Sequence, residues 1–117
     1  MYAMEESADA SSASALAPRR AGMAQAIVAH VYDVTLEEMR AETRGAPRAA
    51  LARQVAMYLS HIVFGMSVNE IATAFMRHRS TAHYALRHVE DLRDDPEVDR
   101  SLKLLETMLV SDAGARA

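Results

Sequence analysis

Residues 77–88, RHRSTAHYALRH, combine three arginines and three histidines with no acidic residue. Side chains of Arg, Ser, Thr and Tyr donate hydrogen bonds to phosphate oxygens, and arginine also donates to the O6 and N7 acceptors of guanine. The segment therefore has the chemistry of a surface that binds nucleic acid. The alternative is an ordinary exposed helix face whose charges only confer solubility, and a basic segment alone does not separate the two.

Basic and acidic residues are unevenly distributed along the 117 residues, whose formal net charge is −3. Between Glu42 and Asp91 the only acids are Glu70 and Glu90. The same span carries the arginines Arg44, Arg48, Arg53, Arg77, Arg79 and Arg87. From Asp94 onward, acids outnumber basic residues. Because affinity for DNA depends on the local field of a patch, the acidic total does not exclude a DNA-binding surface.

Other chemistries have less support. His78, His83 and His88 are five residues apart, the wrong interval for two ligands on one helix face, and there is no cysteine, so we expect no metal site. Ser80 and His83 lack an orienting acid, so we expect neither catalysis nor a cofactor.

No apolar run approaches the roughly 18 residues of a membrane span. The acidic start, MYAMEESADA, does not resemble a secretory signal, and we expect a cytoplasmic protein without a membrane partner.

The elements that must position these side chains are predicted to be helices, because no segment alternates with period two. Residues 1–18, rich in Ser and Ala, are expected to form a disordered arm. A single domain is expected over 19–111, and a short disordered tail over 112–117. Helices are expected over about 21–32, 35–42, 49–64, 68–75 and 80–92, and from Pro96 onward.

Several residues signal helix ends. Capping boxes are predicted at Thr35 with Glu38 and at Ser67 with Glu70. Gly65 is expected to end a helix. Two further N-caps are expected, one at Ser80 or a neighbour and one at Asp95, which precedes Pro96. The residues expected to face the core are Ile27, Val28, Val31, Leu51, Val55, Leu59, Ile62, Ala82, Ala85, Leu86, Val89, Leu92, Val98, Leu102, Leu105 and Leu109. The prediction is an all-α, compact helical domain.

The two helices that flank Met76–Arg79 form a predicted helix-turn-helix. If Ala82, Ala85, Leu86 and Val89 face the core, then Thr81, Tyr84 and His88 lie on the outer face of the second helix. Arg77, Arg79 and Ser80 lie at its N-terminal end, where free N–H groups and the positive end of the dipole favour phosphate.

Three segments carry a resemblance to a known family: VAHVYDVTLEEM, ARQVAMYLSHIVFGMSVNEIATAF and STAHYALRHVEDL. In order and spacing they resemble the C-terminal DNA-binding domain of DnaA, the bacterial chromosomal replication initiator, with its patterns PRQ-A-MYL…SLPEIG-AFG and, more loosely, DHTTVLHA-RKIE. The resemblance spans about Ile27 to Leu109. It implies a fold like that of DnaA domain IV and the Trp repressor, with one helix in the major groove of a short DNA box and a basic loop in the minor groove.

The resemblance assigns contacts residue by residue. It implies phosphate contacts by Arg53, Gln54, His61, Val68, Asn69, Arg77 and Thr81, with further DNA contacts possible at Tyr84 and His88. His61 stands where the family has a phosphate-binding lysine, and a mostly neutral histidine should bind more weakly. The loop TRGAPR departs from the family's run of basic residues, so the minor-groove arginine is either Arg44, the nearest match, or Arg48.

The tip that reads bases departs from the family. The family has Gly-Gly-Arg-Asp-His-Thr-Thr, whereas this chain has one residue fewer, MRHRST, over residues 76–81. The residues expected to meet bases are His78, in place of the family's Asp, with Arg79 and Ser80. Because an acid accepts from cytosine and an arginine donates to guanine, we expect a DNA site that differs from the DnaA box.

None of the four glycines precedes a lysine, so we find no phosphate-binding loop of the GxxxxGK[ST] type and expect no nucleotide partner. The expected function is that of a free-standing, nucleoid-associated bacterial protein that binds duplex DNA and regulates replication initiation or transcription. The alternative is a degenerate copy of the domain that acts as an adaptor and binds a replication or transcription protein.

Overall fold

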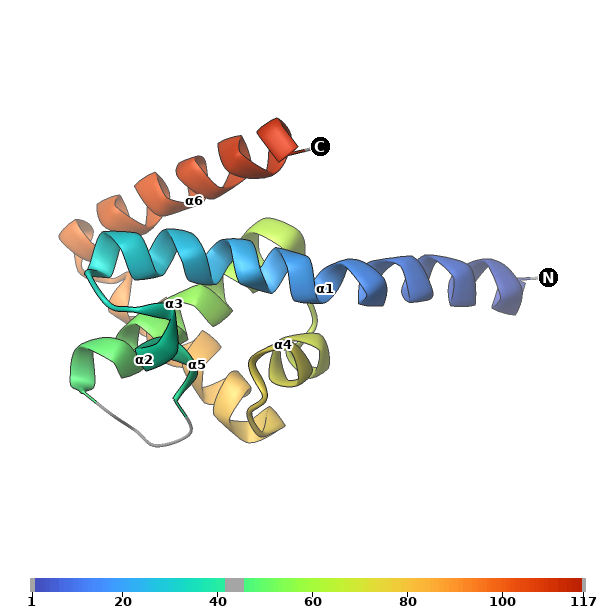
Figure 1. Ribbon diagram of the computed structural model, residues 1–117, viewed down its shortest axis with the longest axis horizontal. Helices are drawn as coiled ribbons and strands as arrows, with labels where there is room; N and C mark the ends of the chain where they lie inside the picture. The colour runs from blue at the N-terminus through green and yellow to red at the C-terminus, as the bar shows by residue number, and fades with distance from the viewer. Residues whose placement is uncertain (1, 42–45, 117) are drawn as a thin grey trace.

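The structure is a computed structural model that describes the backbone of residues 2–41 and 46–116 and the side chains of residues 15–41 and 46–115. Within these residues it is entirely helical, which confirms the predicted all-α class (Figure 1). The helices are α1 (Tyr2–Tyr32), α2 (Leu36–Arg40), α3 (Pro47–Phe64), α4 (Val68–Phe75), α5 (Arg79–Leu92) and α6 (Pro96–Arg116). None of these helices is both long and apolar enough to cross a lipid bilayer.

Four of the predicted helix ends are present, at Thr35, Gly65, Ser67 and Asp95. Thr35 and Ser67 each accept a hydrogen bond from the backbone N–H of the glutamate three residues on, and each glutamate carboxylate accepts one in return. Gly65 ends α3 in the left-handed region, with φ 65°, where glycine has no steric cost. The carboxylate of Asp95 accepts from the N–H of Glu97 at 2.9 Å and so caps α6.

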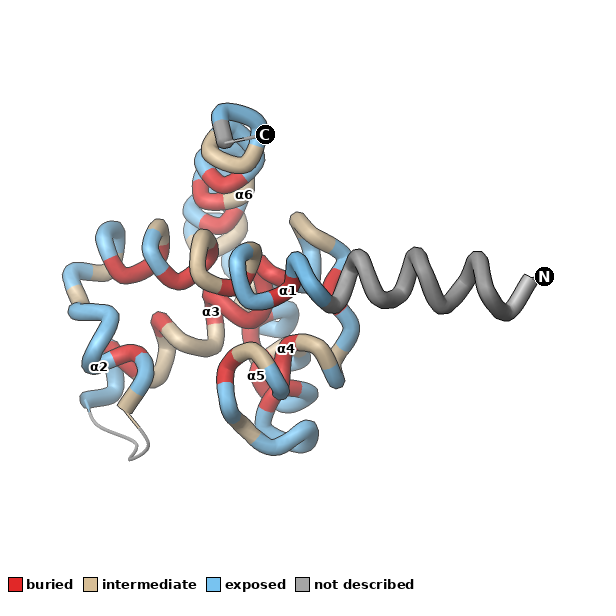
Figure 2. Tube along the Cα trace, turned by 45° about the vertical axis from the view of Figure 1, so that its right-hand side comes forward, coloured by how far each residue is buried: buried red, intermediate tan, exposed pale blue. Residues whose placement is uncertain are grey.

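Helix α3 is the centre of the domain and contacts each of the other five helices. Its residues from Val55 to Ser60 are all buried, because neighbours cover it on nearly every side. The other helices turn one buried face inward, which Figure 2 shows as red segments on the inner sides of the tube. Among the largest fully buried side chains are Met39, Leu59, Ile71, Leu102 and Leu109, so the four helices α2, α3, α4 and α6 contribute to one core.

The N-terminal helix begins much earlier than predicted, at Tyr2 and not near Ala21. The segment has no amphipathic period, but alanine is the strongest helix former, and periodicity alone does not report helix propensity. Ala17 is only 5% exposed and belongs to the core cluster. Helix α1 therefore runs through the boundary predicted at residue 18, and Ala17 on its N-terminal side already packs on the domain.

Three further expectations are corrected. Ile62 is 45% exposed and Val31 is 48% exposed, and Val63 and Phe64 are half-buried in place of Ile62. Helix α6 continues to Arg116, so the tail predicted to start at residue 112 is helical through that position. The other predicted core positions are buried or half-buried.

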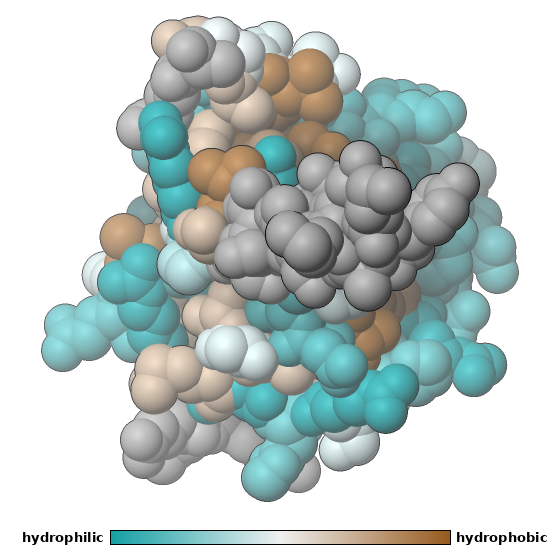
Figure 3. Space-filling view, turned by 90° about the vertical axis from the view of Figure 1, so that its right-hand side faces the viewer, coloured by the Kyte–Doolittle hydropathy of each residue, from teal (hydrophilic) through white to brown (hydrophobic). Residues whose placement is uncertain are grey.

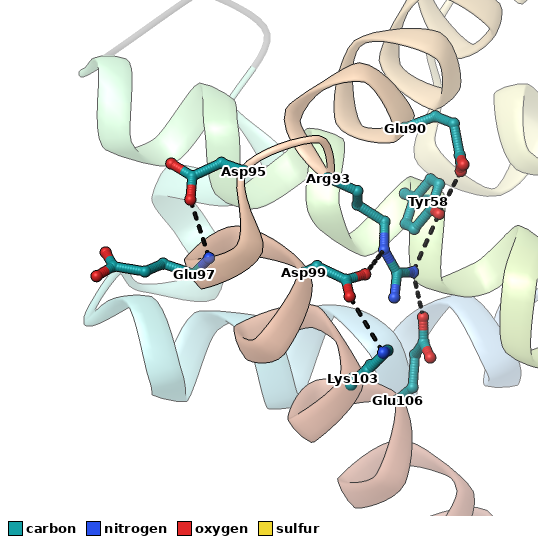
Figure 4. Close-up of polar contacts among 8 residues, drawn as sticks. All are labelled: Tyr58, Glu90, Arg93, Asp95, Glu97, Asp99, Lys103 and Glu106. Atoms are coloured by element: carbon teal, nitrogen blue, oxygen red, sulfur yellow. Dashed lines mark hydrogen bonds and ion pairs between the residues drawn. The ribbon is translucent and has the colours of Figure 1, made fainter.

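A polar network joins α3, α5 and α6 at the end of α5 (Figure 4). The Arg93 guanidinium donates to Asp99 at 2.7 Å and to Glu106 at 2.6 Å, and it also donates to the hydroxyl of Tyr58 at 3.1 Å. That hydroxyl donates in turn to Glu90. Burial alone would lower the pKa of Arg93, but its three hydrogen-bond partners raise it above its ordinary value. The network fixes how the last helix lies on the helix-turn-helix.

Candidate nucleic-acid interface

Helices α4 and α5 pack against each other and are joined by a three-residue turn. Met76 is the C-cap of α4 and has φ 55° and ψ 47°, an uncommon conformation for a residue with a side chain. The N–H of Arg77 donates to the carbonyl of Ala72 at 2.9 Å, which closes the turn. Met76 is 84% exposed, so no burial of its side chain explains the conformation. The backbone bonds of the turn hold it in place.

The first turn of α5 is exposed and carries no acid. His78 is the N-cap, in place of the expected Ser80, and no side chain accepts from the N–H groups that follow it. Arg79, Ser80 and Thr81 are all exposed. Because the first N–H groups of a helix have no partner within the helix, this end offers backbone donors, side-chain donors and a positive dipole to an anion.

The outer face of α5 carries a pair of stacked rings. The Tyr84 and His88 rings lie 5.4 Å apart between centroids and 10° from parallel. Tyr84 is 60% exposed, whereas the inward positions Ala82, Ala85 and Val89 are buried. The structure thus places Thr81 and Tyr84 on the predicted outer face, while His88 is half-buried against its neighbours.

Arg53 and Arg77 converge on the end of α2. Arg53 donates to the carbonyl of Met39 at 2.7 Å and weakly to that of Ala41 at 3.5 Å, and Arg77 donates to the same Ala41 carbonyl at 2.5 Å. Burial and the nearby charge of Arg77 lower the pKa of Arg53, although a guanidinium stays protonated. No carboxylate among the described residues pairs with either arginine. The two charges therefore form a local excess of positive charge that an anion would relieve.

The remaining predicted phosphate contacts lie on α3 and at the start of α4. The His61 side chain is exposed, and its Nδ1 lies 2.8 Å from the carbonyl of Met66, which requires a proton on Nδ1. A neutral His61 therefore presents an acceptor at Nε2, and only the protonated ring donates there. Asn69 is exposed in the first turn of α4, and Gln54 and Val68 are half-buried.

Of the two arginines predicted to enter the minor groove, only Arg48 is among the residues that the structure describes. Arg44 lies outside the described residues. Arg48 is exposed near the start of α3, and its side chain lines a shallow groove with Val31 and Leu104. That groove belongs to α1 and α6, so Arg48 is not grouped with the first turn of α5.

The contacts of Arg53 and Arg77 with α2 have no signal in the sequence. They join residues 12 to 36 positions apart through backbone carbonyls, which any residue type provides. Arg40 also makes a contact over a long distance in the sequence, because it donates to the side-chain carboxamide oxygen of Gln25 at 2.9 Å. Among the described residues, no group of three or more His, Asp or Glu side chains could hold a metal ion. Figure 3 shows mostly hydrophilic surface at the lower right of the molecule and more apolar residues at the lower left.

Two helices joined by a tight turn, with a polar and uncapped first turn on the second, define a helix-turn-helix protein. Comparison with known families matches residues 22–89 to the bacterial dnaA protein helix-turn-helix. The chain belongs to this family, which confirms the resemblance found in its sequence.

Relatives agree with this assignment. The chain is 33% identical over 84 residues to chromosomal replication initiator protein DnaA 2 of Chlamydia pneumoniae; the match spans 71% of this chain and 18% of the relative. A solved structure titled as a DNA replication initiation factor is similar with a TM-score of 0.75 and 29% identity, over 82% of this chain and 30% of that one. The chain thus matches only a minor part of each relative's length.

Proposed function

We propose that the protein binds duplex DNA in a sequence-specific manner through α5, and that it regulates replication initiation or transcription. The observation that carries the proposal is the first turn of α5 in a member of the DnaA helix-turn-helix family. Arg79, Ser80 and Thr81 are exposed there without an acid or a side-chain cap. Helix-turn-helix proteins place this part of the second helix against base edges in the major groove.

In the proposed complex His78, Arg79 and Ser80 meet base edges. Thr81, Asn69 and Gln54 lie on the phosphates, together with His61 when it is protonated and the backbone at Val68. Arg53 and Arg77 supply phosphate contacts with the N–H groups that α2 does not use, since a guanidinium has five donors. Arg44 or Arg48 enters the minor groove, and Tyr84 and His88 extend the surface along α5.

The proposed site differs from the DnaA box because Arg79 favours guanine. Binding-site selection from a random duplex library tests this directly. We expect an enriched motif with a guanine that is lost from the motif selected by Arg79→Ala. Enrichment of an unaltered DnaA box would contradict an altered specificity, and a library without any enrichment would contradict sequence-specific binding.

An adaptor that binds a replication or transcription protein is the second candidate. The observation in its favour is an exposed apolar groove of about 390 Å³ between α1 and α6, lined by Val31, Leu104 and Met108. An adaptor that uses this groove would lose its function in cells on Leu104→Asp and keep it on Arg79→Ala. The DNA-binding proposal predicts the opposite pattern, so one pair of variants separates the two functions.

A further inference from the structure

A cavity of about 370 Å³ lies between α1, α2 and the end of α4. Its size is within the range of about 300–1,000 Å³ that is usual for small-molecule sites. The lining residues that matter for its chemistry are Gly22, Gln25, Arg40, Phe75, Met76 and Arg77. Of these, only Arg77 belongs to the proposed DNA contacts, so the cavity is not explained by DNA binding.

One wall of the cavity carries a buried amide with unused donors. Gln25 is only 5% exposed, and its carboxamide oxygen accepts from Arg40 Nε at 2.9 Å. Its carboxamide nitrogen donates to no atom of the described residues. Among the described residues no buried side-chain nitrogen or oxygen lacks a hydrogen-bond partner, so these N–H groups are open to the solvent of the cavity and can donate to an occupant with an acceptor atom.

Two guanidinium groups line the same cavity without a carboxylate. Arg40 gives one N–H to Gln25 and Arg77 gives one to the Ala41 carbonyl, which leaves further N–H donors on both. No acidic side chain is among the described lining residues. Carboxylate and phosphate groups are the partners that guanidinium donors bind most strongly.

The rest of the lining is apolar and includes Phe75, which is buried, and Met76, whose side chain is 84% exposed. We propose that this cavity binds a small organic anion. Its carboxylate or phosphate lies between Arg40 and Arg77 and accepts from the Gln25 carboxamide. Its apolar body packs on Phe75 and Met76. The inference does not rest on the proposed function, because binding is measured without DNA.

Amide chemical shifts in two-dimensional NMR test the site with 1-naphthyl phosphate and 1-naphthoate as probes and 1-naphthol as the neutral control. We expect saturable shifts of the Gln25 side-chain NH₂ and of backbone amides at Gly22, Arg40 and Met76. Comparing the two anions shows which head group is preferred. Arg40→Gln should weaken binding about tenfold, as expected for loss of one charge-assisted contact.

Gly22→Leu offers a test that leaves every charged group in place. A Cβ at Gly22 meets no heavy atom within 4 Å, so a leucine has room to occupy the cavity, and it improves helix propensity. Gly114→Leu is the matched control, because Gly114 also lies in a helix with nothing within 4 Å of a Cβ. We expect Gly22→Leu to abolish probe binding and Gly114→Leu to preserve it.

Three results would overturn the proposal. The first is the absence of saturable shifts, and the second is wild-type affinity in a folded Gly22→Leu protein. The third is a set of shifts centred on Arg79–Thr81, which would assign the anion to the first turn of α5 and not to the cavity. Failure of DNA binding in a separate assay leaves these results unaffected.

Discussion

Arg79 and Thr81 lie two residues apart in the first turn of α5, and both are exposed. Their predicted roles differ, because Arg79 is placed against a base and Thr81 against a phosphate. Base contacts discriminate between sequences, whereas phosphate contacts bind all sequences alike. Substitution of the two residues should therefore have different effects on specificity.

We predict that Arg79→Ala lowers the preference for the selected duplex over a scrambled one by about 1–3 kcal/mol, the value of one bidentate base contact. Thr81→Ala should weaken binding to both duplexes equally. Fluorescence anisotropy with the two duplexes measures both effects, and Arg100→Ala, an exposed arginine of α6, is the control. An equal loss on both duplexes with Arg79→Ala would place Arg79 on the backbone of the DNA.

The side chain at position 61 is predicted to contact a phosphate of the DNA. Its Nδ1 is engaged with the Met66 carbonyl, so the neutral ring offers no donor to a phosphate. His61→Lys adds a permanent positive charge, and we expect tighter binding with a log–log salt slope steeper by about 1. The exposed His30 of α1 provides the control substitution His30→Lys. An unchanged slope with His61→Lys would show that position 61 does not contact phosphate.

The free energy of unfolding is expected to depend on the protonation of the Tyr58 hydroxyl. Burial and the hydrogen bond to Glu90 raise its pKa above the ordinary value of 10.0, despite the opposing effect of Arg93. A group with a raised native pKa contributes stability below its unfolded pKa, and that contribution is lost as pH rises through the native pKa. The free energy of unfolding should therefore fall above pH 10, and Tyr58→Phe should reduce that fall.

Urea denaturation at pH 8 to 11 measures this effect. Tyr58→Phe is also expected to cost about 1 kcal/mol at neutral pH, since it removes the hydroxyl that bonds Glu90 and Arg93. Tyr84→Phe, at a ring that is 60% exposed, serves as the control. The account of Tyr58 is wrong if the alkaline decline of Tyr58→Phe equals that of the wild type.

At the scale of elements, short local signals set the ends of α4. The capping box of Ser67 and Glu70 starts the helix, and we predict that Ser67→Ala costs about 1 kcal/mol of unfolding free energy. The loss of ordered N–H groups beside Asn69 should also weaken DNA binding. Thermal and urea denaturation measure the first effect, with the exposed Ser101→Ala as control. Equal stability of the two variants would mean that the box contributes nothing.

Local signals of this kind were predictable because the residues that form them are three or four positions apart. Both capping boxes, the left-handed Gly65 and the cap at Asp95 are present as predicted. The start of α1 at Tyr2 was not predictable from periodicity, since that part of the helix depends on alanine propensity. The 45% exposure of Ile62 was not predictable either, because the apolar pattern within α3 does not show which faces its neighbours cover.

The candidate site was predictable to a similar extent. The turn of the helix-turn-helix and the outer face of α5 follow from the spacing of Ala82, Ala85 and Val89. The convergence of Arg53 and Arg77 on the Ala41 carbonyl does not, because it joins three elements through the backbone. The cavity beside Gln25 was missed for the same reason.

At the scale of the whole molecule, the charges are separated. The chain has a net charge of −3, yet the first turn of α5 carries no acid, and Glu70 and Glu90 are the only acids between Glu42 and Asp91. The Arg93 network ties the acidic α6 to the far end of α5 and so holds the two regions apart. A protein of this kind can bind phosphate at one end despite an overall negative charge.

Fluorescence anisotropy of the full chain with a DnaA-box duplex and a scrambled duplex, at two salt concentrations, measures whether the protein binds duplex DNA. We predict binding with a log–log salt slope of about −3 to −6, which corresponds to several phosphate contacts. We also predict that Arg53→Ala and Arg79→Ala weaken it. Absence of binding to either duplex at low salt would contradict DNA binding by this protein.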